Sequence, residues 1–148
     1  MWKIIILTLL FLPLYSQELK VDAELNFVIT NTIIKYKNTI VNRPPYLQPT
    51  IYLKSSPLYP TLLGLTREIS PQVFIIDINI LSNNPFIERT ILHELIHVRQ
   101  ISSGQLVTLY NGWLWQNKFY SFDSPYESRP WEVEARVLAS ILTNESFK

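Results

Sequence analysis

Two hydrophobic periodicities that follow each other in the middle of the chain constrain the fold most. Residues Val73–Ile80 alternate with period two, which predicts a strand with one apolar face and one half-polar face. Pro85–Ser102 shows helical spacing, with apolar residues around most of the circumference: Phe86, Ile87, Ile91, Leu92, Leu95, Ile96, Val98 and Ile101. A helix that is apolar on most sides is buried. The pattern therefore predicts a strand followed by a central, buried helix.

Residues that commonly start and stop helices lie at both ends of this predicted helix. Asn84 is a suitable N-cap, and Pro85 suits the first helical position because its missing N–H has no intrahelical partner there. Ser103 and Gly104 form a stop signal at the other end. These residues predict a helix over Pro85–Ser102.

The helix contains the string His93-Glu94-Leu95-Ile96-His97, and the chain has no other histidine. Residues four apart on a helix lie one turn above each other on the same face, so both imidazoles can bind one zinc ion. Glu94 is placed to take a proton from a water that the metal activates. Two histidines and a carboxylate in a buried helix need partners, because an unpaired buried charge costs several kcal/mol. A metal ion supplies such a partner.

Other parts of the chain predict further elements. Residues 19–42 have near-helical apolar spacing and predict a first helix, and a short strand is expected at Ile51–Lys54 within a proline-rich stretch. Leu106–Phe122 is aromatic and β-branched with two turn signals, which predicts one or two hairpins. Pro130 opens a last helix that continues to the C-terminus.

The amino-acid composition limits the classes of protein to which this chain can belong. With 47% hydrophobic and 17% charged residues, we expect one globular α+β domain: a small twisted sheet, a buried motif helix, a hairpin insertion and a C-terminal helix that closes the site. The absence of cysteine excludes disulfides, thiolate zinc ligands and a cysteine nucleophile. A formal net charge of +1 argues against nucleic acid as a partner.

The N-terminus has the pattern of a secretory signal. Lys3 precedes an apolar run from Ile4 to Tyr15, and Ser16 is a small residue before a polar segment. This predicts a signal peptide over 1–16, cleavage after Ser16, a mature domain over 17–148, and a secreted or periplasmic protein with no membrane span. Retention of the segment as an N-terminal anchor, or even as the working part of a membrane-anchored protein, is the alternative.

Two strings together resemble the gluzincin group of zincin metallopeptidases: ILHELIHVRQ at Ile91–Gln100 and RPWEVEARVLA at Arg129–Ala139. The resemblance implies that zinc is bound by His93, His97 and a glutamate on a second helix. The Glu-x-x-Ala pattern selects Glu132 for that glutamate. It also implies that Glu94 is the general base and then the proton donor, and that the substrate is a peptide or protein.

Glu134 competes with Glu132 for the role of third ligand. Residues two apart on a helix point about 200° away from each other, so both cannot face one metal. Periodicity alone leaves the choice open, and either acid could simply favour the positive end of the last helix.

One position departs from the gluzincin pattern. Many gluzincins carry an aspartate four residues after the ligand glutamate, where it orients the first histidine. This chain has Arg136 there, so Asp77, Asp123 or a backbone carbonyl would have to orient the histidine instead.

The sequence indicates less clearly which residues would bind the substrate. The resemblance implies that the strand before the motif helix offers a free edge to an extended peptide, although Val73–Ile80 could equally be an internal strand. The aromatic residues between 110 and 126 could line a cleft or form core. Tyr120, Tyr126 and Arg129 all remain candidates to stabilise the oxyanion.

These observations predict a secreted or periplasmic zinc metallopeptidase. The alternative is a non-catalytic, zinc-stabilised binding module of the cell envelope. The presence of Glu94 favours the enzyme, because a purely structural zinc site needs no general base and has a protein side chain as its fourth ligand. The oligomeric state is not predicted.

Overall fold

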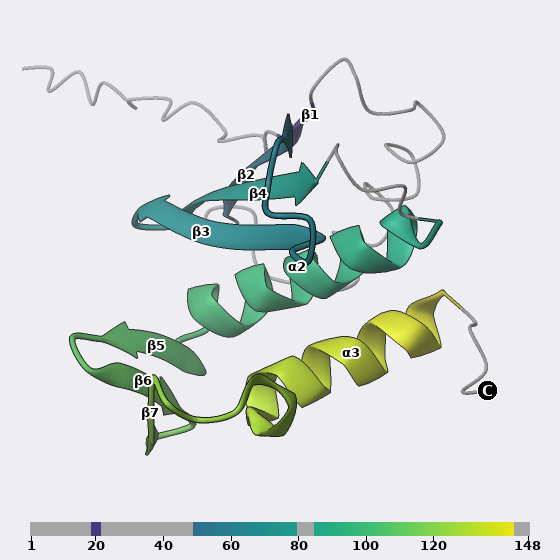
Figure 1. Ribbon diagram of the computed structural model, residues 1–148. Coiled ribbons are helices and arrows are strands. Elements are labelled where there is room, and N and C mark those ends of the chain that lie inside the picture. Colours follow the sequence, from purple (N-terminus) through teal and green to yellow (C-terminus); the bar gives the residue numbers. More distant parts are fainter. Residues whose placement is uncertain (1–18, 22–48, 80–84, 144–148) are drawn as a thin grey trace, which may run out of the picture.

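The computed structural model describes residues 19–21, 49–79 and 85–143, and in this part of the chain one helix lies between a sheet and a second helix (Figure 1). The elements are β1 (Leu19–Val21), β2 (Thr50–Ser56), β3 (Gly64–Ser70), β4 (Val73–Asn79), α2 (Ile87–Ser102), β5 (Leu106–Leu109), β6 (Gly112–Trp115), β7 (Lys118–Ser121), the 3₁₀ helix η2 (Tyr126–Ser128) and α3 (Pro130–Leu142). The α+β class and the small sheet expected from the sequence are confirmed.

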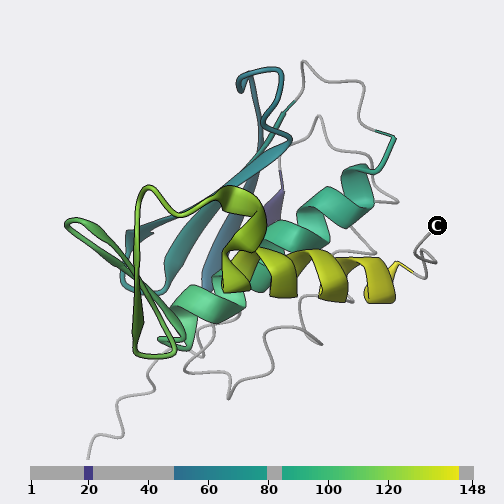
Figure 2. The same cartoon turned by 60° about the horizontal axis from the view of Figure 1, so that its bottom comes forward.

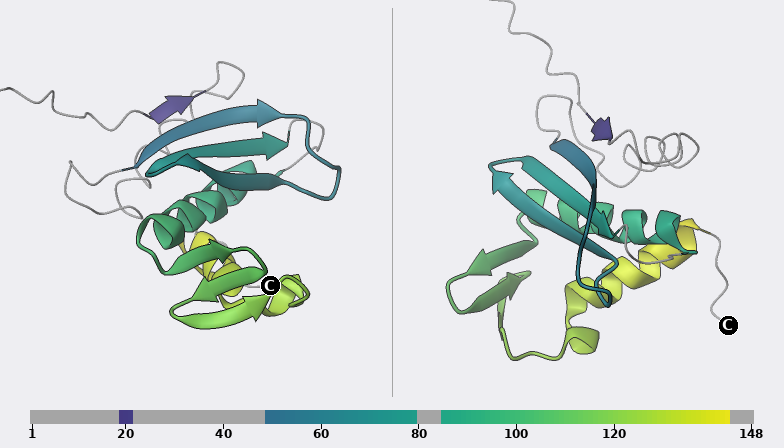
Figure 3. Two further views of the ribbon diagram at one scale, coloured as in Figure 1. Left: turned by 90° about the vertical axis from the view of Figure 1, so that its left-hand side faces the viewer. Right: turned by 45° about the horizontal axis from the view of Figure 1, so that its top comes forward.

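The main sheet has the strand order β1-β2-β4-β3. β1, β2 and β4 are parallel, and β3 is antiparallel to β4. Ile51 and Leu53 of β2 pair with Phe74 and Ile76 of β4, so these four side chains share one face. All four are buried in one cluster with α2, which lies against this face of the sheet (Figure 3).

β4 is internal, so of the two alternatives left open for Val73–Ile80 the internal strand is correct and the free edge is wrong. Among the described residues β1 and β3 are the edge strands, and β3 was not predicted from the sequence. Gly64 and Thr66 pair with Ile78 and Ile76 and therefore lie on the face that α2 covers. Because neither is apolar, β3 lacks the alternation that reveals a half-buried strand.

Helix α2 begins at Ile87, so the predicted start at Pro85 is wrong by two residues. Phe86 occupies the N-cap position without a side-chain cap, and Asn84 lies outside the described residues. The other end agrees with the prediction: Ser103 caps the helix, and Gly104 has a φ of 74°, which glycine adopts without steric cost.

Helix α3 runs antiparallel alongside α2, and the β5-β6-β7 sheet lies where α2 ends and α3 begins (Figure 2). Pro130 opens α3 as predicted. The hairpin region predicted from the sequence forms one antiparallel sheet of two consecutive hairpins, and β6 contributes Trp115 to a second small core with Leu106 and Trp131. This arrangement fixes the first turn of α3 against the end of α2.

The N-terminal predictions are tested only in part. Leu19–Val21 is strand β1, paired in parallel with β2, so the predicted helix over 19–42 is wrong at its beginning. Tertiary pairing overrides local helical spacing there. Residues 22–42 and the predicted signal peptide over 1–16 lie outside the described residues. Among the helices that are described, none is long and apolar enough to cross a membrane.

Candidate metal centre

The two histidines of α2 present their Nε2 atoms to the same point. Leu92, Leu95 and Ile96 anchor the helix in the main core and are fully buried, which turns His93 and His97 away from the sheet. The Nε2 atoms of the histidines lie 3.0 Å apart, and the two rings meet edge to face. The spacing of four residues therefore has the consequence expected from helix geometry.

Helix α3 brings a carboxylate to the same point. Oε2 of Glu132 lies 3.2 Å from Nε2 of His93 and 3.3 Å from Nε2 of His97. Glu132 follows Trp131, and Ala135 lies one turn further along in the core, so packing of the first turn of α3 directs Glu132 toward α2. The structure brings together His93, His97 and Glu132, the three ligands predicted from the sequence.

The spacing of the three ligand atoms fits zinc. With bonds of about 2.0 to 2.2 Å, two ligands of a tetrahedral zinc ion lie roughly 3.3 Å apart. The three observed separations are 3.0, 3.2 and 3.3 Å. The ligand atoms of His93, His97 and Glu132 therefore form a triangle close to one face of such a tetrahedron.

Gln100 orients the second histidine. Nδ1 of His97 lies 2.7 Å from Oε1 of Gln100, which as a carbonyl oxygen can only accept a hydrogen bond. The amide nitrogen of Gln100 donates to the backbone oxygen of Trp131 and to Glu134, so the network fixes the orientation of the amide. A proton of His97 is thereby held on Nδ1, so Nε2 is the ring nitrogen that a metal would bind.

Two other acidic candidates, Glu134 and Asp77, have other partners. Glu134 accepts hydrogen bonds from Arg99 at 2.6 Å and from Gln100 at 2.8 Å, so it supports the site from outside rather than joining it. Asp77 faces the other side of the sheet, where it binds Ser56 and Arg67. Asp77 is therefore not the group that orients the first histidine.

Arg136, which occupies the position of the gluzincin aspartate, pairs with Glu127. It therefore links the body of α3 to η2 and does not contact the three ligands.

Glu94 is held by the edge strand. The hydroxyl of Thr66 donates to Oε2 of Glu94 at 2.7 Å and to the backbone oxygen of Glu94 at 3.0 Å. A Cβ at Gly64 would lie 2.8 Å from Oε1 of Glu94, closer than real contacts allow, so glycine makes room for the carboxylate. Glu94 is only 6% exposed. The strand thus fixes the side chain that the sequence identified as the base.

The electrostatic environment shifts the pKa values of Glu94 and Glu132 in opposite directions. Burial raises the pKa of Glu94, although His97, His93 and the Thr66 hydrogen bond oppose the shift. Burial also acts to raise the pKa of Glu132, but hydrogen bonds from His93 and His97 hold it well below its usual range. Glu132 is therefore ionised, as an oxygen ligand of a metal must be, whereas Glu94 has the higher proton affinity, as a general base requires.

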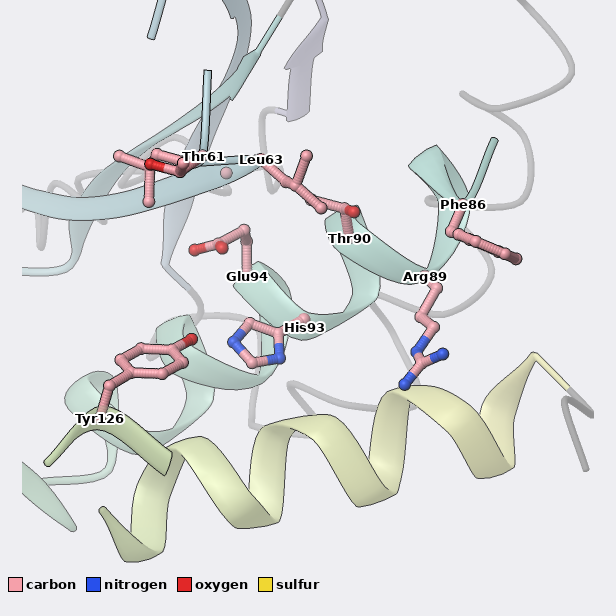
Figure 4. Close-up of a pocket in the computed structure, with 10 residues that line it drawn as sticks. Thr61, Leu63, Phe86, Arg89, Thr90, His93, Glu94 and Tyr126 are labelled. Atoms are coloured by element: carbon pink, nitrogen blue, oxygen red, sulfur yellow. The ribbon is translucent and has the colours of Figure 1, made fainter. Parts of the chain in front are cut away.

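Two clefts meet at this site. The N-terminal cleft, with a volume of about 460 Å³, lies beside the start of α2 and is shown in Figure 4. The metal cleft, with a volume of about 240 Å³, is lined by the three ligand residues. His93, Glu94 and Tyr126 line both. The candidate metal centre is therefore accessible from two sides.

The three candidates for oxyanion stabilisation lie in different surroundings. Tyr120 packs edge to face on Trp131 and lines neither cleft. Arg129 stacks over Trp113 at 4.4 Å and lines the metal cleft. Tyr126 lines both clefts, and burial together with its hydrogen bond to Glu132 raises its pKa, so its hydroxyl keeps its proton. Of the three, Tyr126 is best placed to donate a hydrogen bond at the centre.

Three residues of the site were missed in the sequence. Gln100 lies three residues after His97, a helical neighbour spacing that was available as a signal. Gly64 and Thr66 carried no such signal, because only the pairing of β3 with β4 brings them to Glu94.

The chain matches no protein-family model, and neither the curated proteins nor the solved structures include a significant match to it. The chemistry of the site therefore has to be argued from its geometry.

Proposed function

We propose that this protein is a zinc-dependent metallopeptidase. The observation that carries the proposal is the triangle of ligand atoms from His93, His97 and Glu132, with sides of 3.0 to 3.3 Å, beside the Glu94 carboxylate in an accessible cleft. Zinc bound there would polarise a peptide carbonyl and lower the pKa of a water molecule.

The residues of the chain have distinct roles in this proposal. Glu94 accepts the proton of the attacking water and later delivers it to the leaving amine. Tyr126 would give up its hydrogen bond to Glu132 and donate instead to the carbonyl oxygen as negative charge develops on it. Gln100 keeps His97 in the tautomer that can bind metal.

The edge strand suggests how a peptide would bind. Residues of β3 and the segment before it line both clefts. β3 has β4 on one side and no strand on the other in the part of the chain that the structure describes. An extended peptide can add to such an edge through main-chain hydrogen bonds, which would place its backbone beside Glu94.

The alternative, a zinc-stabilised binding module, finds less support. A structural zinc site is closed by four protein ligands. The metal-ligand group found among the described residues has three members, and two clefts reach it. A water-binding fourth position suits a hydrolase.

Metal removal tests the proposal directly. We expect about one zinc ion per purified chain, and chelation should lower the melting temperature by roughly 5 to 10 °C when free zinc had stood near 100 times its Kd. Elemental analysis and calorimetry measure both quantities, and cleavage of a mixed peptide library should require the metal. The same chelator should leave the melting temperature of a His93→Ala, His97→Ala double variant unchanged. Absence of metal, together with an unchanged melting temperature of the parent, would refute the proposal.

Thr66 offers a second test, because its hydroxyl positions the base without touching the ligands. Thr66→Val keeps the shape of the side chain but removes the hydrogen bond to Glu94, so we expect kcat to fall about tenfold or more through misplacement of the carboxylate. KM and zinc affinity should stay unchanged, and Thr66→Ser should restore kcat. Equal loss of kcat in the Val and Ser variants would show that the hydroxyl has no such role.

A further inference from the structure

The two clefts that meet at Glu94 differ in their walls. The metal cleft is lined by all three ligand residues, whereas the N-terminal cleft has only His93 in common with them and extends along the start of α2. In the view of Figure 4, Leu63 and Thr90 lie between Glu94 and Phe86. The N-terminal cleft therefore begins at the proposed general base and extends into a largely aliphatic and aromatic region.

The apolar side chains in the wall of this cleft are exposed. Leu62, Leu63 and Phe86 are 36%, 41% and 55% exposed, although each could have contributed to a core. Exposed apolar side chains that gather in one hollow mark a binding site more often than scattered ones do. Burying them against an apolar group is favourable because it removes their surface from water.

The charges around the cleft favour the same kind of group. Among the described residues that line it, Glu94 is the only carboxylate, and the proposed reaction uses that carboxylate. The other charged side chain is Arg89, whose guanidinium points toward α3 and away from Glu94 (Figure 4). A lysine or arginine side chain would enter this cleft without an acidic partner of its own, which is costly.

The volume of about 460 Å³ falls within the range of about 300 to 1,000 Å³ that is usual for small-molecule pockets. It is therefore large enough for a leucine, methionine or phenylalanine side chain. A small side chain would leave part of the apolar wall exposed to water.

We propose that the N-terminal cleft is a specificity pocket that selects substrates with a large apolar side chain next to the scissile bond. The substrate class depends on the proposed peptidase function, whereas the inference of an apolar binding cleft depends only on the residues that line it. Leu63 is the specificity-determining residue to test, because it lines the cleft close to Glu94.

The first experiment measures specificity in the zinc-loaded full chain. Peptides that differ only in the residue next to the scissile bond should be cleaved with a kcat/KM that is 10- to 200-fold higher for Leu or Phe than for Ala, since this is the range that apolar pockets reach. Leu63→Asp should abolish the preference, and Leu63→Ala should reduce it if the aspartate variant fails to fold. Ile69→Asp is the matched control, because Ile69, on β3, is an exposed aliphatic residue like Leu63 but lies outside both clefts.

The second experiment does not depend on catalysis. The full chain, with and without zinc, is titrated with 4-methylpentanamide, an amide with a leucine-like tail, and with acetamide as the control. We expect saturable NMR shifts at the methyl groups of Leu62 and Leu63 with the branched amide alone, and loss of these shifts in Leu63→Ala.

The outcomes separate the two proposals. Saturable binding of 4-methylpentanamide without any peptide cleavage would keep the apolar pocket and reject the peptidase. Cleavage with equal rates for Leu and Ala, together with no amide binding, would keep the peptidase and overturn the pocket.

Discussion

Replacing Glu94 with glutamine is expected to lower peptide hydrolysis by a factor on the order of 100 or more, as is usual when a general base is lost. Glutamine has nearly the same shape, so it should fit beside Gly64 and accept the hydrogen bond from Thr66. It cannot take up a proton at neutral pH. The fold and the zinc content should therefore stay unchanged, whereas kcat should fall strongly.

Steady-state kinetics and elemental analysis of the same preparation check this result. Glu88→Gln is the matched control, because Glu88 lies in the first turn of the same helix and lines neither cleft. A Glu94→Gln variant that cleaves peptides as fast as the parent would remove Glu94 from the mechanism. Loss of zinc in that variant would instead mean that Glu94 helps to hold the metal.

The second large effect concerns the third ligand. Glu132→Ala should lower zinc affinity by at least an order of magnitude, because it removes the only carboxylate oxygen in the ligand triangle. Glu134→Ala should leave zinc in place, since Glu134 is bound to Arg99 and Gln100 instead. Its ion pair with Arg99 is about one-third exposed on both sides, so its loss should change stability only slightly.

Zinc titration in competition with a chromophoric chelator measures both affinities. The opposite pattern, with zinc lost only from the Glu134 variant, would transfer the ligand role to Glu134 and leave the peptidase proposal in place. If both variants bind zinc like the parent, then the ligand set is wrong and an oxygen or nitrogen outside this triangle must complete it.

Local patterns predicted those elements in which each residue's neighbours along the chain decide its environment. Pro130 opens α3 and Gly104 follows the end of α2 as expected. The turn signals at Asn111-Gly112 and Gln116–Lys118 lie at the two connections between the three strands of the second sheet. In each case a backbone preference acts within a few residues.

Local patterns failed where a distant segment decides the structure. Leu19–Val21 looks helical in isolation but forms β1 because β2 offers it a parallel partner. Gly64 and Thr66 face α2 from β3, where the space is filled by Glu94 rather than by an apolar side chain. The sequence does not reveal this strand, because Gly64 and Thr66 on its inner face contact Glu94 and do not contribute apolar side chains to the core.

The sequence by itself determined that two imidazoles and a carboxylate lie on one helix, since the spacing of His93, Glu94 and His97 translates directly into helix geometry. It also narrowed the third ligand to Glu132 or Glu134. Only the tertiary structure shows which of the two lies beside the histidines, because the packing of α3 on α2 turns Glu132 toward them and Glu134 toward Arg99. Tertiary packing likewise decided that β3 is the edge beside the cleft, since strand order depends on contacts between segments that local periodicity does not record.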